Sequence, residues 1–134
     1  MKNLVVVEDN QDIQLLVQTV FFMDKRFAAP SGVESAEEGL ELASSTGPGL
    51  IVLDHGLTGK LTGLQASRWF KRVAPNAKII LFTAHDELRA LAEAEPAIDA
   101  FLLKTEVWKL LAIGQRLSGL SPAQVDVRSE VEEP

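Results

Sequence analysis

The chain has 134 residues, of which 46% are hydrophobic and 24% charged, a composition that fits one globular domain. The absence of cysteine excludes disulfide bonds and thiolate metal sites, and the net charge of −6, without a dense cluster of Lys and Arg, argues against direct nucleic-acid binding. The first residues contain only a short apolar stretch, Leu4–Val7, too short for a signal peptide or a membrane span, so we expect a cytoplasmic protein without membrane contact.

Five short apolar runs predict five β-strands. Four of the runs are continuous rather than alternating, which is typical of a parallel sheet that helices cover on both faces. The second run is the weakest, and we expect it to form an edge-like, less buried strand. The runs are Leu4–Val7, Phe27–Ala29, Leu50–Leu53, Ile79–Phe82 and Phe101–Leu103.

Segments with helical periodicity follow each of these runs. The first has apolar residues at spacings of three and four from Ile13 to Phe21. The second begins after Ser35, which is a candidate N-cap with Glu38 as its capping-box partner, and it ends before Gly47. Three further helices are expected, over about residues 64–73, 86–94 and 106–117.

The order of elements is therefore β-α repeated five times. This order predicts an α/β fold with a doubly wound, five-stranded parallel sheet, right-handed crossovers and helices on both faces. Ligands of such sheets bind in the crevice at the carboxyl ends of the strands. We expect this domain to cover residues 1–119 and the acidic stretch 120–134 to form a C-terminal tail or linker.

Polar side chains follow four of the five predicted strands. Because the carboxyl ends of parallel strands share one edge of a sheet, we expect these side chains to meet in one crevice. Three crowded carboxylates repel one another, and a hard divalent cation with oxygen ligands, Mg²⁺ or Mn²⁺, relieves that repulsion. The residues are Glu8 and Asp9 after the first strand, Asp54 after the third, Thr83 after the fourth and Lys104 after the fifth.

Within this crevice Asp54 is a candidate nucleophile for phosphoryl transfer. A carboxylate that attacks phosphorus in line with the leaving group needs positive charge and hydrogen-bond donors around the equatorial oxygens. The cation, the Lys104 ammonium group and the Thr83 hydroxyl supply these groups. The residues therefore fit a phosphoryl-transfer site that acts almost wholly through electrostatics.

Four motifs in chain order, VVVEDN, IVLDHGL, ILFTAHD and FLLK, resemble the receiver domain of two-component response regulators over about residues 3–118. The resemblance implies a CheY-like, flavodoxin-like fold with strand order 2-1-3-4-5. It also implies that Asp54 accepts the phosphoryl group, that Asp9 binds Mg²⁺ directly and that Glu8, in place of the more usual aspartate, binds it through water. The backbone carbonyl of Gly56 is implied as a further ligand.

The same resemblance also implies which residues form the switch and which proteins are the partners. Thr83 and Lys104 contact the phosphoryl oxygens, and Phe101 matches an aromatic position that turns inward when Thr83 is drawn toward the phosphoryl group. Simple core packing is the alternative explanation for Phe101. The implied donor is a histidine kinase or a histidine phosphotransfer protein, the output is contact with an unknown downstream protein, and a homodimer is a further expectation. The chain would then be no enzyme beyond its own phosphorylation and dephosphorylation.

Other residues depart from the usual receiver pattern or suggest alternative functions. Thr105 follows Lys104 where many receivers have proline, so we expect a trans peptide bond there. This Lys-Thr pair and Leu120-Ser121-Pro122 are similar to receivers of LuxR-type transcription regulators, which makes a fragment of such a regulator one alternative. Another alternative is a Mg²⁺-dependent phosphohydrolase, although Gly56 stands where such enzymes carry a second acid. His85 is expected to border the pocket and to modulate the rate of dephosphorylation.

Overall fold

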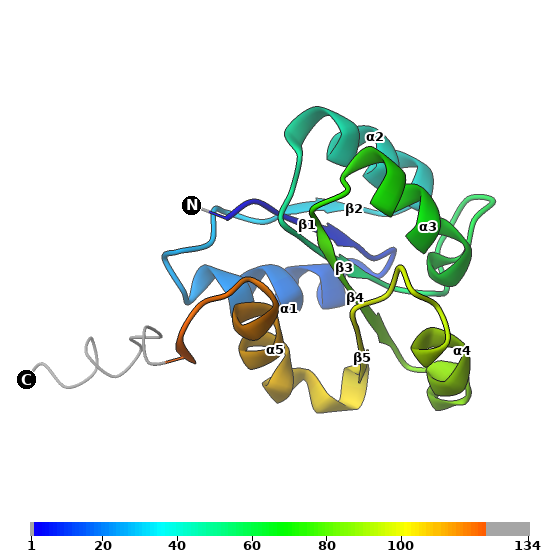
Figure 1. The fold of residues 1–134 in the computed structure, drawn as a ribbon. Helices are drawn as coiled ribbons and strands as arrows, with labels where there is room; N and C mark the ends of the chain where they lie inside the picture. Colours follow the sequence, from blue (N-terminus) through cyan, green and yellow to red (C-terminus); the bar gives the residue numbers. More distant parts are fainter. Residues whose placement is uncertain (1, 123–134) are drawn as a thin grey trace, which may run out of the picture.

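The computed structural model describes residues 2–122, in which five parallel strands form a sheet of order β2-β1-β3-β4-β5 (Figure 1). This order confirms the doubly wound α/β fold predicted above. The strands are β1 (Leu4–Val7), β2 (Ser31–Val33), β3 (Leu50–Leu53), β4 (Lys78–Thr83) and β5 (Ala100–Leu103). The helices are α1 (Gln11–Phe22), α2 (Ala36–Thr46), α3 (Gly63–Val73), α4 (Arg89–Glu93) and α5 (Leu110–Leu117), with 3₁₀ helices η1 (Asp86–Leu88) and η2 (Lys104–Lys109).

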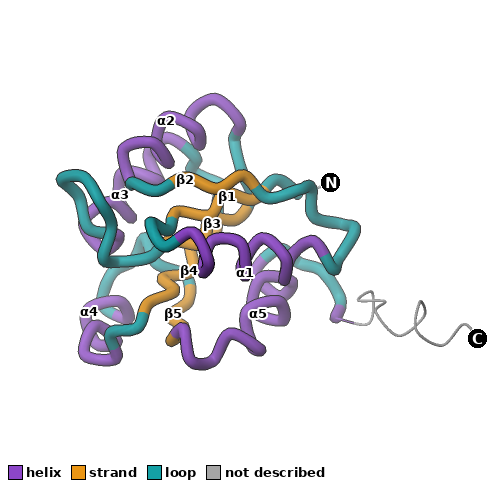
Figure 2. Tube along the Cα trace, turned by 180° about the vertical axis from the view of Figure 1, so that it is seen from behind, coloured by secondary structure: helices purple, strands orange, loops and turns teal. Residues whose placement is uncertain are grey.

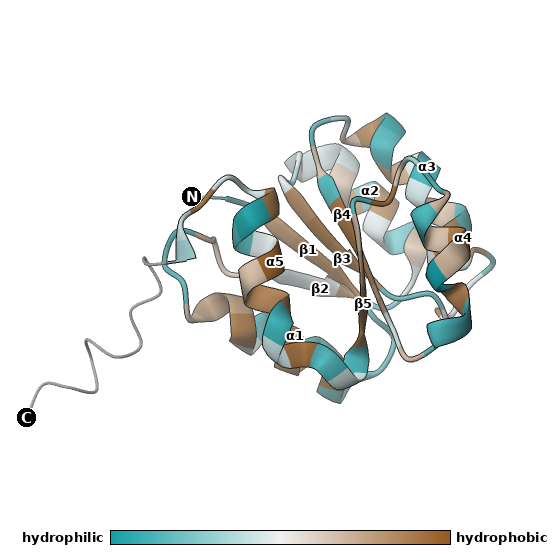
Figure 3. Ribbon diagram, turned by 60° about the horizontal axis from the view of Figure 1, so that its bottom comes forward, coloured by the Kyte–Doolittle hydropathy of each residue, from teal (hydrophilic) through white to brown (hydrophobic). Residues whose placement is uncertain are grey.

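The sheet lies between two layers of helices, and its strands are apolar on both faces. Alternate residues of β1 belong to different cores: Val5 and Val7 pack with α2, α3 and α4, whereas Leu4 and Val6 pack with α1 and α5. Figure 3 shows the hydrophobic strands between the two layers, and Figure 2 shows α1 and α5 together on one face. Burial on both faces is the reason why the strands appear in the sequence as continuous apolar runs.

Capping residues fix the bounds of α2, and a glycine allows the close contact of α1 with α5. Ser35 and Glu38 form the predicted capping box at the start of α2, and Gly47 ends this helix with a left-handed φ of 59°. On the other face, Gly114 lets α5 approach α1 closely, because a Cβ atom at this position would collide with the ring of Phe21. The packing of α5 against α1 therefore depends on a residue without a side chain.

The second strand was predicted at the wrong place. The structure puts β2 at Ser31–Val33, paired with Val5–Val7 of β1, whereas Phe27 makes only an isolated bridge with Lys2. The apolar character of Phe27 has another cause: its ring packs edge-on against Phe21 at 5.0 Å between ring centroids. Phe27 thus belongs to the core beneath α1, and the more polar edge strand is defined by its backbone pairing.

The last two helices differ from their predicted bounds because each begins with a 3₁₀ segment. The expected helix over 86–94 consists of η1 followed by α4, and η2 begins at Lys104 itself, directly after β5. The Lys104–Thr105 peptide is trans, as predicted. No helix within residues 2–122 is long and apolar enough to cross a membrane.

The structural contacts of the domain continue past Leu117. Leu120 packs against the core between the sheet and helices α1 and α5, and the carbonyl of Ser121 accepts a hydrogen bond from Arg26 Nη2 at 2.8 Å. Residues 123–134 of the expected acidic tail lie outside the described part of the chain.

Candidate functional site

Strand β1 brings Glu8 and Asp9 to the carboxyl edge of the sheet. Asn10 follows them and caps α1, because its Oδ1 accepts a hydrogen bond from Ile13 N at 3.0 Å. The backbone N–H of Asn10 also donates to Glu8 Oε2 at 3.1 Å, so the start of α1 helps to orient the Glu8 carboxylate. Glu8 is only 2% exposed, and an acidic side chain buried this deeply requires an opposite charge or a metal nearby.

Strand β3 places Asp54 beside this pair. The backbone N–H of Asp54 donates to the carbonyl of Val7 at 2.9 Å, which continues the pairing of β3 with β1. One carboxylate oxygen, Oδ1, accepts a hydrogen bond from the backbone N–H of His55 at 2.7 Å. The carboxylate is thus held by the main chain, and its second oxygen is available for other partners.

Lys104 connects the two buried acids from the far side of the pocket. Its Nζ atom lies 2.8 Å from Glu8 Oε1 and 3.0 Å from Asp54 Oδ2. The residue follows β5 directly, and β5 is separated from β3 only by β4, so the order of the sheet brings this ammonium group over the end of β3. One cation therefore neutralises part of the charge of two carboxylates.

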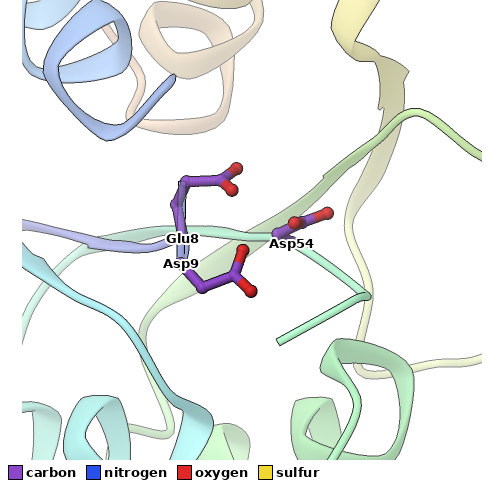
Figure 4. Close-up of side chains that lie close together, drawn as sticks. All are labelled: Glu8, Asp9 and Asp54. Carbon is purple, nitrogen blue, oxygen red and sulfur yellow. The ribbon is translucent and has the colours of Figure 1, made fainter. Parts of the chain in front are cut away.

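Asp9 completes a cluster of three carboxylates with Glu8 and Asp54. One oxygen of each residue lies within 4.8 Å of the others, and Figure 4 shows the three side chains directed into the same space. With Lys104 as the nearest counter-charge, the ionised cluster keeps an excess of negative charge. This oxygen-only donor set fits a hard divalent cation such as Mg²⁺.

The buried charges perturb each other's pKa values. Burial raises the pKa of Glu8, the hydrogen bond from Lys104 opposes this effect, and the negative charge of Asp54 raises the pKa further, so the net change is upward. Burial alone would lower the pKa of Lys104, but its hydrogen bonds to Glu8 and Asp54 outweigh that effect and raise it overall. Lys104 is therefore held in its charged form, and added positive charge would favour the ionised form of Glu8.

Thr83 and Phe101 lie at two neighbouring strands. Thr83 ends β4, opposite Leu103 of β5, and its fully buried hydroxyl oxygen accepts a hydrogen bond from His85 N at 3.3 Å. Phe101 is half-buried on β5 and packs on the core that α2, α3 and α4 cover. The guanidinium carbon of Arg89 lies 4.7 Å above the ring centroid of Phe101. The positions suit the predicted switch pair, whose movement stays a prediction.

Gly56 and His85 occupy the rim of the site. Gly56 lies in an exposed bend two residues after Asp54. His85 lies in the loop after β4, with its imidazole half exposed and its ring centroid 6.5 Å from that of His55. The ligand role of Gly56 and the modulating role of His85 are predictions that these positions permit.

Three contacts at the site could not be recognised in the sequence. The close approach of Gly63 is the first, because a Cβ atom at this residue would collide with the carbonyl oxygen of Asp54. The others are the bond between Lys104 and Glu8 and the stacking of Arg89 on Phe101. Glycine directly after the capping residue Thr62 is the only local signal that points to one of them.

Comparison with known families identifies residues 4–112 as a response regulator receiver domain. Among curated proteins, the chain is 26% identical over 104 residues to a nitrate/nitrite response regulator homologue of Haemophilus influenzae, covering 75% of this chain and 49% of that protein. It is 25% identical over 96 residues to sporulation initiation phosphotransferase F of Bacillus subtilis, covering 70% of this chain and 73% of that protein. The alignment thus spans only about half the length of the first relative.

Solved structures share the fold. A response regulator of the LuxR family from Aurantimonas sp. has a TM-score of 0.76 at 24% identity, with 98% of this chain and 99% of that chain covered. The response regulator TrrA from Thermotoga maritima, solved with Mg²⁺-BeF, has a TM-score of 0.68 at 28% identity, covering 83% of this chain and all of that one. The family match covers residues 4–112, and the sheet has the strand order 2-1-3-4-5 that the resemblance implied. This chain therefore belongs to the response regulator receiver domain family.

Proposed function

We propose that this chain accepts a phosphoryl group on Asp54 from a phosphohistidine of a histidine kinase or phosphotransfer protein. The observation that supports this role most directly is the position of Lys104 Nζ, 3.0 Å from Asp54 Oδ2 and 2.8 Å from Glu8 Oε1. An acceptor aspartate must keep its negative charge for attack while positive charge lies ready for the oxygens of the incoming group. Lys104 meets both conditions.

In the proposed reaction, an Asp54 carboxylate oxygen forms a bond to phosphorus as the bond between phosphorus and the donor imidazole nitrogen breaks. The electron pair of that bond returns to the imidazole, which takes a proton from solvent. Lys104 and the Thr83 hydroxyl then donate hydrogen bonds to the phosphoryl oxygens, and the N–H of His55 keeps Asp54 oriented. These groups come from the carboxyl ends of three neighbouring strands, β3, β4 and β5, or from the loops after them.

A bound Mg²⁺ would neutralise charge on the transferred group. Asp9 and Asp54 would hold it directly, Glu8 through water, and the carbonyl of Gly56 would add a further ligand. The three carboxylate oxygens within 4.8 Å of one another support this assignment. The raised pKa of Glu8 supports it as well, because a carboxylate that burial disfavours gains from a nearby cation.

The proposed output is a change in protein–protein contact. Phosphorylation would draw the Thr83 hydroxyl toward the new group and let Phe101 turn inward, which shifts the receiver between two conformations. We propose that residues 1–119 form this switch in the cytoplasm, with 120–134 as a tail or linker. The half-length match to the nitrate/nitrite regulator homologue also fits a receiver that is one part of a longer regulator.

Mass spectrometry after incubation with an acyl phosphate and Mg²⁺ tests the proposal. We expect an adduct of one phosphoryl group, which does not form when Mg²⁺ is left out of the incubation and is absent in Asp54→Asn. Asp9→Asn is the matched control, since it removes a neighbouring carboxylate: a slower reaction is expected, still with modification at Asp54. An adduct that survives in Asp54→Asn, or steady hydrolysis of many phosphate esters, would refute the assignment.

A further inference from the structure

A pocket of about 680 Å³ lies against α5, and none of its lining residues belongs to the proposed phosphorylation site. Trp108 at the end of η2 lines it together with Ala112 and Ile113 of α5. Leu120 and Pro122 line it from the chain that follows α5. The lining is thus mainly apolar, and the volume is that of pockets that bind small molecules, which measure about 300–1,000 Å³.

Hydrogen bonds fix the part of the pocket that follows α5. Gly119 turns the chain at the end of the helix with a left-handed φ of 73°. The backbone N–H of Leu120 then donates to the carbonyl of Gln115 at 2.8 Å, and the Leu120 side chain packs on the core beside α1 and α5. The carbonyl of Ser121 is held by Arg26 Nη2 at 2.8 Å. This side of the pocket is therefore preformed, so a ligand pays little for ordering it.

The tryptophan of the pocket is far more exposed than is usual for this residue type. Trp108 is 72% exposed, although tryptophan is largely buried on average. The only other tryptophan of the sequence, Trp69, has the guanidinium carbon of Arg72 at 4.9 Å from its ring centroid. Within residues 2–122 no cation stacks on Trp108 in this way. Its ring is therefore available to an apolar ligand.

Both charged groups of the lining are cations. Lys109 and Arg116 line the pocket, and no acidic residue of the described chain does so. The Lys109 Nζ atom is paired with Glu106 Oε2 at 3.1 Å, whereas Arg116 forms no ion pair within residues 2–122. A guanidinium group without a counter-charge thus lies beside an apolar surface, on a chain whose net charge is −6. A ligand that matches both features carries a negative group on an apolar body.

We propose that this pocket binds a small apolar anion, such as a medium-chain carboxylate or an aryl sulfonate. The apolar body lies against Trp108 and Ile113, and the anionic group accepts hydrogen bonds from Arg116, whose planar guanidinium can bind two oxygens at once. The proposal is independent of phosphorylation of Asp54, because the pocket shares no residue with that site.

Titration of the full chain with the fluorescent anion anilinonaphthalene sulfonate tests this site, with phenylnaphthylamine as the uncharged analogue. We expect saturable binding of one anion per chain and at least threefold weaker binding in Arg116→Gln, because the ion pair at this exposed side chain is lost. The uncharged probe should bind equally to the wild type and to this variant. Arg72→Gln, which alters the exposed arginine stacked on Trp69, is the matched control and should leave both affinities unchanged.

Ala112→Asp tests the pocket independently, because it puts a negative charge into the lining at an exposed helix position. The anion should bind at least tenfold more weakly, while circular dichroism remains that of the wild type. Decanoate should displace the bound sulfonate from the wild type. Equal affinity of the anion for the wild type, Arg116→Gln and Ala112→Asp would overturn the proposal. A dimer in sedimentation velocity that buries Trp108 and excludes the probe would also overturn it, because a second copy of the chain would then occupy the pocket.

Discussion

The ion pair between buried Asp24 and partly exposed Arg26, remote from the acidic cluster, allows a quantitative prediction about stability. Asp24 follows α1 and is 1% exposed, and its carboxylate accepts hydrogen bonds from Arg26 Nη2 at 2.7 Å and from Gln115 Nε2 at 3.1 Å. Arg26 also binds the carbonyl of Ser121. This network joins the end of α1, helix α5 and the chain that follows α5, so we expect its loss to destabilise the domain.

The magnitude follows from the pKa of Asp24. The hydrogen bond from the Arg26 side chain is the main cause that lowers this pKa from 3.8 to about 2. At about 1.4 kcal/mol per pKa unit, the ionised carboxylate stabilises the folded state by about 2 kcal/mol. Because the folded pKa is below the unfolded one, this contribution is complete above about pH 4 and is lost as the pH falls toward about 2.

Urea denaturation of the wild type and of Asp24→Asn, followed by circular dichroism across this pH range, measures the effect. Near neutral pH the variant should be less stable by about 2 kcal/mol, and the difference should shrink toward zero as the pH approaches 2. Glu41→Gln, an exposed acid on α2, is the control, with an expected change below about 0.5 kcal/mol. A gap between wild type and Asp24→Asn that is equal at neutral and acid pH would refute the charge argument.

Three further predictions concern the proposed phosphorylation site. Lys104→Met should slow phosphorylation by an acyl phosphate about a hundredfold, because the ammonium group stabilises the transferred group. The same variant should bind Mg²⁺ more tightly in calorimetry, because Lys104 competes with the metal for Glu8 and Asp54. A Mg²⁺ affinity that falls together with the phosphorylation rate would contradict this prediction. Glu8→Gln should weaken Mg²⁺ binding about tenfold in calorimetry, as expected for a residue that acts through water, and unchanged affinity would exclude it from the site. Gly63→Ala should cost at least about 2 kcal/mol in urea denaturation because its methyl group meets the Asp54 carbonyl, whereas Gly49→Ala, with open space around it, should cost less than about 1 kcal/mol.

The strands show where sequence patterns predict structure and where they fail. The continuous apolar runs of β1, β3 and β4 indicated buried strands correctly, because both faces of these strands pack under helices. The edge strand Ser31–Val33 has no such run, since only its backbone pairing with β1 makes it a strand. Phe27 was misread as strand because burial of an apolar side chain does not by itself distinguish a strand from a loop that packs on the core.

The alternation of strands and helices in the sequence was sufficient to predict the fold and the edge of the sheet at which Glu8, Asp9, Asp54 and Lys104 lie. This worked because the ends of parallel strands converge whatever the details of packing. The roles of these residues in phosphoryl transfer stay predictions that the proposed variants test.

Tertiary structure alone decided which of these groups touch and how deeply each is buried. The bonds from Lys104 to both Glu8 and Asp54, the close approach of Gly63 to Asp54 and the edge-to-face pair of His55 and His85 all join separate segments of the chain. A pattern along the sequence reports periodicity and local capping, whereas such contacts depend on side-chain conformation and on the path of each loop. The electrostatics of the site therefore follow from the three-dimensional arrangement, because the energy of each charge depends on its burial and on the distance to its neighbours.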